Sequence, residues 1–294
     1  MTTKTKIVLM VLALAINCIC THTISAQDKE NGKTYLIVRG DDLGMTQGSI
    51  EGFEEAIIKG VLTCASIQVP APWFEAAAEL TKRHPAFCFG IHMTLISEWQ
   101  GYRWRPVLPY DEVSSIVDED GYLHTSPENL LAGNPKPEEI EAELRAQINL
   151  ALKRGIPISY LDQHYINFDE LPQGKQIKQK LSEEYKLPIS GHLGEQRASG
   201  IYNIAIEKKL AGAVDMIENL ESGLYLWVCH PGIDSPEQNA LMHTYPEHIF
   251  KDKGVGKHRA EVLRVLTSYD VKAATIRNEI ILTDYKKIVK TSIK

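Results

Sequence analysis

The sequence predicts an α/β protein with a single TIM-like (β/α) barrel, regular or distorted, built on parallel strands. Three observations support this: apolar runs alternate with amphipathic stretches, polar residues recur where the apolar runs end, and 44% of the residues are hydrophobic. A strand followed by a helix, repeated along the chain, implies right-handed crossovers. An open doubly wound sheet is the alternative, but no G-x-G-x-x-G motif follows the first strand to support a nucleotide site.

The elements can be followed in order from residue 34. Short apolar, β-rich runs predict strands at 34–39, 62–69, 87–95, 158–162, 224–229 and 271–276. Amphipathic spacing predicts helices at 48–59, 73–83, 135–153, 177–185 and 259–268. Residues 99–125 are rich in aromatic and turn residues and have little periodicity. We expect them to form a long excursion over one end of the fold, because such excursions in compact domains are often functional.

The first 26 residues are expected to lie outside the fold. Lys4 and Lys6 precede an apolar run of 14 residues, and a small residue, Ala26, then precedes the expected cut. This pattern is typical of a secretory signal peptide and predicts a secreted or periplasmic protein. A core helix or an uncleaved anchor is the alternative. The run is short for a bilayer, so we expect no membrane span in the mature chain, residues 27–294, which we expect to be one domain.

Composition and cysteine use exclude several classes of protein. The formal net charge is −6, which gives no reason to expect nucleic acid as a partner. Beyond the leader, the chain has three cysteines, Cys64, Cys88 and Cys229, and no C-x-x-C pair. This odd number argues against a disulfide framework and against a thiolate zinc site. Because all three lie in apolar runs, we expect buried free thiols.

Polar residues with catalytic or metal-binding chemistry follow the predicted strands. They are Asp41 and Asp42 after the first strand, His92 near the end of the third, Asp162 and His164 at the end of the fourth, and His230 after the fifth. In a parallel barrel all strand C-termini open on one face, where active sites are built. We therefore expect these residues, which are far apart in sequence, to converge there.

The adjacent pair Asp41–Asp42 is the most informative of these features. Two neighbouring carboxylates after an apolar strand repel each other and resist desolvation, and a divalent cation relieves both costs. An aspartate oxygen with two imidazoles suits Zn²⁺ or a similar ion with open positions for water. The alternative is an Asp-Asp turn that caps the next helix, and each histidine taken alone could be a core residue. The metal hypothesis depends on all of them lying at equivalent positions.

The sequence resembles the YdjC-like carbohydrate deacetylases, which are related to the polysaccharide deacetylases. The resemblance begins with the segment Leu36-Ile37-Val38-Arg39-Gly40-Asp41-Asp42-Leu43-Gly44. It continues in family order through Gly90-Ile91-His92-Met93-Thr94-Leu95, then through residues 116–121, 143–147, Leu161-Asp162-Gln163-His164, Cys229-His230-Pro231-Gly232 and 259–267. These segments extend over nearly the whole chain beyond the leader, and their ordered set is more specific than any one of them.

The resemblance implies a role for each candidate residue. Asp42, His92 and His164 would bind one divalent metal ion, Zn or Mg. Asp41 would be the catalytic base and His230 the acid that protonates the leaving amine. Asp162 would lie beside the metal and orient a ligand or the substrate. The implied reaction removes an acetyl group from an N-acetylated amino sugar or oligosaccharide.

The chain departs from the family pattern at three places. Ile166 stands where the family usually has the second histidine of His-x-His, and Ser190 opens a segment where an arginine is usual. Arg39-Gly40 replaces the usual small residues before the aspartate pair. The three predicted metal ligands are retained despite these changes, so we expect the changes to affect mainly which substrate is bound.

Three further hypotheses stay open. Trp99 and Trp104 could form a stacking platform for sugar rings, or could simply pack on the core. The chain could be a non-catalytic carbohydrate-binding protein on a decayed deacetylase fold. It could also be a metal-dependent esterase or phosphoesterase, for which Arg39 and Arg197 are the nearby cations. Whether two chains pair as a homodimer is not decided by the sequence.

Overall fold

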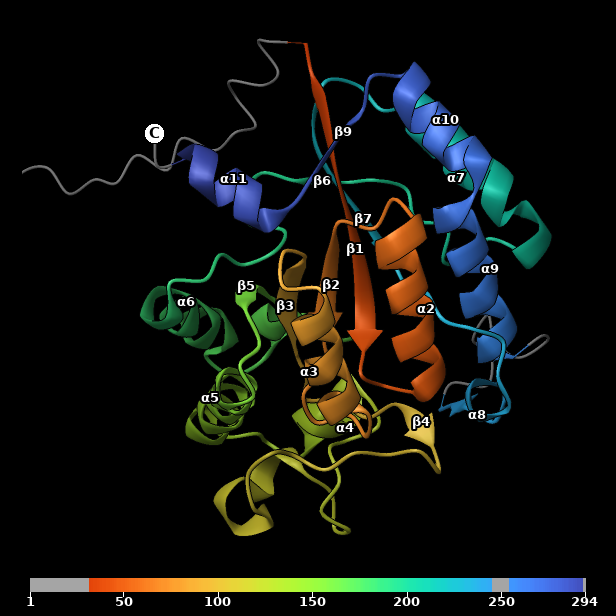
Figure 1. Cartoon of the computed structure of the whole chain (residues 1–294). Helices are drawn as coiled ribbons and strands as arrows, with labels where there is room; N and C mark the ends of the chain where they lie inside the picture. Colours follow the sequence, from red (N-terminus) through yellow and green to blue (C-terminus); the bar gives the residue numbers. More distant parts are fainter. Residues whose placement is uncertain (1–31, 245–253, 293–294) are drawn as a thin grey trace, which may run out of the picture.

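A sheet of parallel strands forms the centre of the protein, shown in the computed structural model of Figure 1, which describes residues 32–244 and 254–292. The strand order is β5-β3-β2-β1-β7-β6, with β9 beside β1, and every pairing in this sheet is parallel. Its strands are β1 (Thr34–Leu43), β2 (Cys64–Ile67), β3 (Cys88–Met93), β5 (Ile158–Gln163), β6 (Gln196–Arg197), β7 (Gly223–Cys229) and β9 (Ile281–Thr283). The fold is a distorted (β/α) barrel, as predicted.

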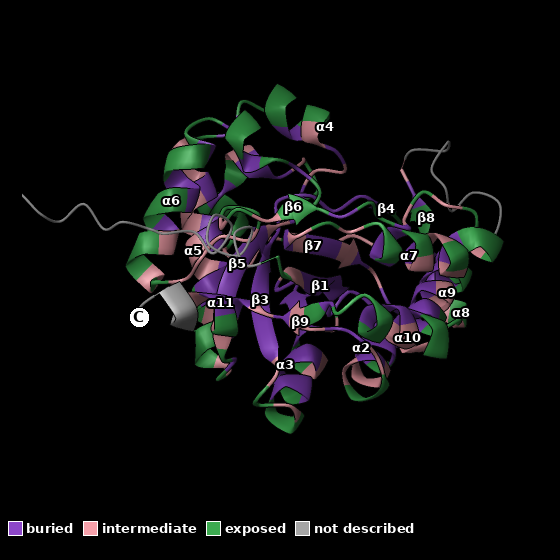
Figure 2. Cartoon of the chain, turned by 90° about the horizontal axis from the view of Figure 1, so that it is seen from above, coloured by how far each residue is buried: buried purple, intermediate pink, exposed green. Residues whose placement is uncertain are grey.

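Helices surround this sheet, and Figure 2 shows buried strands in the middle and helices with exposed outer faces around them. The helices are α2 (Gln47–Lys59), α3 (Phe74–Arg83), α4 (Pro127–Ala132), α5 (Pro137–Lys153), α6 (Gly174–Tyr185), α7 (Lys209–Glu218), α8 (Pro236–Asn239), α9 (Val255–Thr267), α10 (Tyr269–Arg277) and α11 (Tyr285–Ser292). Short 3-10 turns lie at Tyr110–Glu112, Ser114–Ile116, Phe168–Glu170 and Ile206–Lys208. The five predicted helices form close to their predicted limits.

Strand β1 is the central strand of the sheet, because it pairs with β2, β7 and β9. Helix α2 packs directly on it through the ring of Phe53. A Cβ atom at Gly40 would lie 2.5 Å from that ring, so only glycine lets the helix approach this closely. Thr46 begins α2, where its side chain accepts a hydrogen bond from the backbone N–H of Ser49 and the Ser49 hydroxyl closes a capping box.

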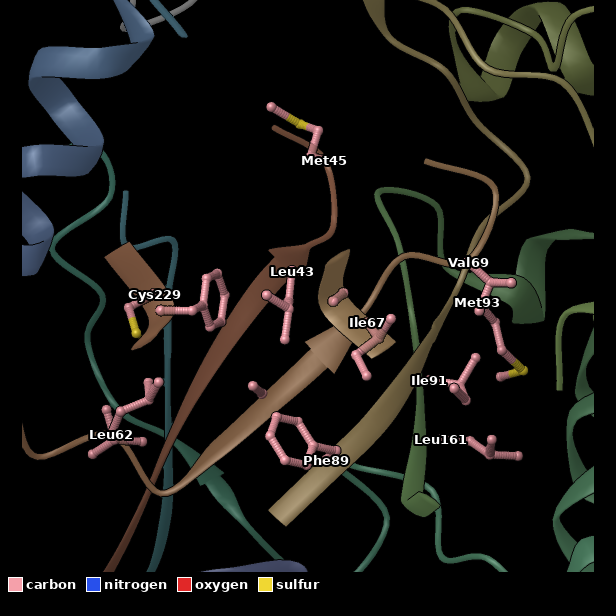
Figure 3. Close-up of a cluster of buried hydrophobic side chains, with 14 of the residues drawn as sticks. Leu43, Met45, Leu62, Ile67, Val69, Phe89, Ile91, Met93, Leu161 and Cys229 are labelled. Atoms are coloured by element: carbon pink, nitrogen blue, oxygen red, sulfur yellow. The ribbon is translucent and has the colours of Figure 1, made fainter. Parts of the chain in front are cut away.

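Apolar side chains from neighbouring strands fill the space between the sheet and its helices. Figure 3 shows Leu43, Ile67, Phe89 and Ile91 among them. Each such side chain contributes about 1.5–3 kcal/mol on full burial. Cys64, Cys88 and Cys229 are buried free thiols, as expected.

The predicted excursion over residues 99–125 covers the C-terminal end of the strands and appears beyond the β1 arrowhead in Figure 1. It opens with β4 (Trp99–Gln100), which pairs antiparallel with β8 (Met242–His243). The buried carboxylate of Glu143 on α5 holds the excursion by accepting hydrogen bonds from the backbone N–H groups of Val107 and Leu108, at 2.9 and 3.0 Å. The excursion thereby forms a wall at the end of the barrel where the candidate site lies.

One strand prediction is wrong. Residues 271–276, predicted as the last strand, lie in α10, and the last strand is β9. The hydroxyl of Ser268 caps this helix by accepting a hydrogen bond from the backbone N–H of Val271. Val271, Ala274 and Thr275 are its buried residues, and their spacing of three and four residues is helical. The β-branched residues of this segment favoured a strand, but the helical spacing of its buried residues agrees with the helix that the segment forms.

The predicted signal peptide, residues 1–26, lies outside the described residues. The secreted or periplasmic location was inferred from that segment alone. We correct that prediction, because nothing can be concluded from residues 1–31 and no described feature is a sign of secretion. Within residues 32–244 and 254–292, no helix has both the length and the apolar character needed to cross a membrane.

Candidate active site

The candidate residues converge at the C-terminal ends of the strands. Asp41 and Asp42 end β1, His92 lies in β3, Asp162 in β5, and His164 and His230 directly follow β5 and β7. All six line one cavity of about 840 Å³. Two groups of these residues are close enough to hold a cation together: Asp42 with His92 and His164, and Asp41 with His92 and Asp162.

The first group has the geometry of a metal site. Asp42 Oδ1 lies 3.6 Å from His92 Nε2 and 3.4 Å from His164 Nδ1, and the two ring nitrogens are 3.2 Å apart. Metal–ligand bonds of about 2.0–2.1 Å at tetrahedral angles place ligand atoms about 3.3 Å apart. Asp42 Oδ1 is buried and has no hydrogen-bond partner among the described residues. These three atoms therefore fit a divalent cation.

The backbone at Asp42 explains how two successive carboxylates reach one site. Consecutive side chains of a regular strand point to opposite faces. Asp42 has φ 70°, and the pairing of β1 with β2 shifts register between Gly40 and Leu43. A left-handed residue costs roughly 1 kcal/mol, and such strain is typical of functional sites. The sequence predicted that the strand would end at residue 39, before the aspartates. In the structure β1 continues to Leu43, so both aspartates lie in its last residues.

Arg39 holds Asp41 from the same strand. Its Nε and Nη2 atoms donate to the two oxygens of Asp41, each at 2.7 Å, and Nη1 donates to the Ser190 hydroxyl at 2.5 Å. Asp162 Oδ2 lies 3.1 Å from Arg39 Nη2. Burial alone would raise the pKa of Asp41, but Arg39 outweighs it and lowers the pKa below its usual value. Asp41 is therefore ionised at neutral pH.

Each candidate histidine ligand has its own carboxylate partner. Asp162 Oδ2 lies 3.1 Å from His92 Nδ1, and Glu98 Oε2 lies 2.9 Å from His164 Nε2. Burial would lower the pKa of His164, but Glu98 and Asp42 outweigh it and raise the pKa to about 9. In both pairs the carboxylate lies beside the ring nitrogen that faces away from the candidate cation, and the contact between Glu98 and His164 is a hydrogen bond.

The charges buried at the site are compatible with a bound cation. Four buried carboxylates lie there, those of Asp41, Asp42, Glu98 and Asp162, together with the buried guanidinium groups of Arg39 and Arg259. Arg259 Nη2 donates to Asp42 Oδ2 at 2.6 Å and leaves Oδ1 for another partner. With neutral imidazoles the cluster has an excess of two negative charges. One divalent cation would balance them, and so do protons on His92 and His164, whose pKa values the neighbouring carboxylates raise.

His230 lies on the other side of the carboxylate pair. Its Nδ1 atom is buried and has no hydrogen-bond partner among the described residues, and its ring centroid is 5.0 Å from that of Tyr202. Burial lowers the pKa of His230 to about 4, although Asp42 and Asp41 oppose that shift. The ring is therefore neutral at pH 7 and would take up a proton only when negative charge develops beside it.

The two tryptophans of the predicted aromatic platform differ in their relation to the cavity. Trp99 and Trp104 are each only 2% exposed, and Trp104 Nε1 donates to the carbonyl of Ile96 inside the protein. Trp104 does not line the cavity, which favours the packed alternative for this residue, whereas Trp99 contributes to the cavity lining. Tyr165 and Tyr202 also line the cavity, and Tyr165 is 43% exposed.

Sequence reasoning missed Glu98, Arg259 and Tyr202 as parts of the site. Arg259 lies within a segment that carries the family resemblance, and this signal could have identified it as a candidate site residue. Glu98 and Tyr202 lie in irregular segments with no signal of their own. Ile166, which stands in place of a histidine, is buried in the core.

Comparison with known proteins places the chain in a family. The model of the YdjC-like protein family matches residues 35–276. The chain belongs to this family. Its YdjC-like relatives include a carbohydrate deacetylase of Brevibacillus brevis, 35% identical over 154 residues, which are 52% of this chain and 58% of that protein. The chain thus matches somewhat more than half the length of that relative.

Other YdjC-like relatives match over most of their length. A carbohydrate deacetylase of Vibrio cholerae is 26% identical over 86% of this chain and 96% of its own. In structure, the YdjC-like chain is similar to an Enterococcus faecalis protein described as a cellobiose-phosphate cleavage protein, with a TM-score of 0.71 and 24% identity, over 87% of this chain and 99% of that one. This last likeness supports the fold alone.

Proposed function

We propose that this YdjC-like protein is a metal-dependent hydrolase that deacetylates N-acetylated amino sugars or oligosaccharides. The observation that carries the proposal is the trio of Asp42 Oδ1, His92 Nε2 and His164 Nδ1 within 3.6 Å of one another, beside the ionised Asp41. The names of the curated relatives, carbohydrate deacetylases, support the same activity. We propose residues 27–294 as one catalytic domain.

The chain's own residues divide the chemistry of amide hydrolysis between them. A bound Zn²⁺ or Mg²⁺ would lower the pKa of a water molecule and polarise the acetyl carbonyl. Asp41, fixed by Arg39, accepts the proton of the attacking water. The departing nitrogen must be protonated, because an amine anion is too poor a leaving group; His230, neutral in the resting site, takes up a proton as negative charge develops beside it and donates that proton to the nitrogen. Asp162 orients His92, and the products are acetate and a free amino sugar.

The phosphoesterase alternative has less support. A phosphate substrate would need a cation that is free to bind it. Arg39 is fully engaged with Asp41 and Asp162. Arg259 is engaged with Asp42 through Nη2, while its Nε and Nη1 atoms have no hydrogen-bond partner among the described residues. Of the arginines that line the cavity, this leaves Arg197 and part of the Arg259 guanidinium group. A non-catalytic sugar-binding role leaves the acid–base pair of Asp41 and His230 without a purpose.

The test is acetate release from a panel of N-acetylated oligosaccharides by the purified chain, supplied in turn with Zn²⁺, Mg²⁺ or chelator. We expect turnover with at least one divalent ion and none with chelator. Parallel assays with acetyl esters and phosphate esters separate the alternatives. Sugar binding without acetate release under any metal condition would support the non-catalytic hypothesis and reject ours.

A further inference from the structure

We propose that Glu98 is a positioning residue that fixes the imidazole of His164 so that Nδ1, and not Nε2, faces the metal. This inference rests on the metal site of the proposed function. Glu98 lies five residues beyond the end of β3 and belongs to none of the motifs found in the sequence.

The contact between the two side chains is short and buried. Glu98 Oε2 lies 2.9 Å from His164 Nε2, and Glu98 is only 2% exposed. An ionised carboxylate can only accept hydrogen bonds, so Nε2 must carry the proton. In a neutral ring the lone pair is then on Nδ1, which lies 3.4 Å from Asp42 Oδ1 and 3.2 Å from His92 Nε2. Glu98 thereby selects the tautomer that can bind a cation at this point.

His92 shows the opposite arrangement. Its Nδ1 is 3.1 Å from Asp162, and its Nε2 faces Asp42 Oδ1 and His164. The two imidazoles therefore present different nitrogens to one point, and each has its own carboxylate within 3.1 Å of the other ring nitrogen. Such carboxylate partners fix the orientation of a metal-binding histidine and raise its basicity.

Glu98 also connects the metal site to the excursion. Its backbone carbonyl accepts a hydrogen bond from the N–H of Thr244 at 3.0 Å, and Trp99 next to it pairs with His243. The ring of Trp104 packs edge-on against His164, with centroids 6.2 Å apart. Glu98, directly before the excursion, and Trp104 within it thus supply one carboxylate and one ring that contact His164 after β5.

The first test is metal affinity. We expect the Glu98→Ala variant to bind Zn²⁺ roughly 10–100-fold more weakly than the wild-type chain in chelator competition. The Glu98→Gln variant should lose less, because its amide oxygen still accepts the Nε2 proton. The matched control is Glu143→Gln, which removes another buried carboxylate that anchors the same excursion without touching the candidate ligands. That variant should keep the wild-type affinity.

The second test reads the tautomer directly. In the zinc-loaded wild-type chain with ¹⁵N-labelled histidine, NMR should show His164 bound through Nδ1 with a proton on Nε2, and His92 the reverse. Binding of His164 through Nε2 would overturn the inference, and so would unchanged zinc affinity in Glu98→Ala. If Glu98→Ala fails to fold, the zinc affinity of Glu98→Gln and the histidine spectrum of the wild-type chain still test the inference. A wild-type chain that binds no divalent ion at all would overturn both this inference and the proposed function.

Discussion

Two neighbouring aspartates have different partners at the site. Asp41 is tied by both oxygens to Arg39, whereas Asp42 gives one oxygen to Arg259 and keeps Oδ1 for the cation position. The positive φ at Asp42 turns both side chains to the same cavity. The different roles that we propose for these two chemically identical residues thus depend on their partners and on one strained backbone position.

Replacing Asp41 should separate catalysis from metal binding. We expect Asp41→Asn to bind the divalent ion as the wild-type chain does and to lose roughly 10²–10⁴-fold in kcat for acetate release, because the amide cannot accept the water proton. Metal content and turnover are measured on the same preparation. Asp118→Asn, which breaks an ion pair with Arg103 outside the cavity, is the control. Near wild-type turnover in Asp41→Asn would remove Asp41 as the base.

Tyr165 is the exposed aromatic ring of the cavity, and it has φ 61° directly after His164. We expect Tyr165→Ala to raise KM for an oligosaccharide several-fold with little change in kcat, because a sugar ring loses its stacking partner. Tyr165→Phe should keep the wild-type KM. Tyr110→Ala, an exposed tyrosine that does not line the cavity, is the control. An unchanged KM in Tyr165→Ala would exclude this contact.

At the scale of elements, the contact between β1 and α2 depends on a missing side chain. We expect Gly40→Ala to destabilise the protein by about 1–3 kcal/mol, because the new methyl group would overlap the Phe53 ring. Urea unfolding measures the change. Gly200→Ala is the control, since a Cβ there would meet its nearest atom at an ordinary 3.9 Å. Equal stability of the two variants would show that α2 shifts freely on the sheet.

Lys209 at the start of α7 gives a pH dependence that does not involve the metal site. It is 1% exposed, and its ammonium donates to the carbonyls of Ile201 and Tyr202, at 2.6 and 2.9 Å. Burial lowers its pKa from 10.5 to about 8, although Glu261 opposes the shift. The unfolded chain therefore binds this proton more tightly than the folded chain. As a result, the free energy of unfolding rises as the pH increases from about 8 to 10.5, and below pH 8 the full cost of the buried ammonium remains.

The corresponding experiment compares urea unfolding at pH 7.5 and pH 10. Relative to Lys209→Met, the wild-type chain should gain roughly 1–3 kcal/mol between these two pH values. The exposed neighbour gives a control, because Lys208→Met should show the same pH dependence as the wild-type chain. A parallel pH response of wild type and Lys209→Met would contradict the expected shift in pKa.

For the whole molecule, the candidate ligands come from β1, β3 and the end of β5, so a bound ion would join three segments of the barrel. A ligand that binds only the folded state stabilises it by about 2.7 kcal/mol at a concentration of 100 Kd. We expect Zn²⁺ to raise the Tm of the chelator-treated wild-type chain by roughly 5 °C or more.

The matched variants test whether this stabilisation passes through the candidate site. His92→Ala should lose the zinc-dependent rise in Tm, because one of three ligands is gone. His124→Ala removes a histidine outside the cavity and should keep it. A zinc-dependent rise in His92→Ala equal to that of the wild-type chain would mean that the ion binds elsewhere.

Part of this fold could be predicted because it depends on local pattern. The strands at the core of the sheet and the five amphipathic helices follow from periodicity along the chain. The short strands β4, β6, β8 and β9, the helix α7, the short helices α4 and α8, and the amphipathic α11 were not predicted. Residues 271–276 were assigned wrongly because residue type was weighed above spacing, and the helix cap at Ser268 was overlooked.

The sequence by itself determined the fold class, the family and the polar residues at the strand ends, because strand ends of a parallel barrel must meet on one face. Only the tertiary structure decided which carboxylate holds which nitrogen. Arg39, Glu98 and Arg259 contact their partners across 2, 66 and 217 positions of sequence. Such contacts depend on the register of β1, its turn at Asp42 and the path of the excursion, and no local pattern encodes these.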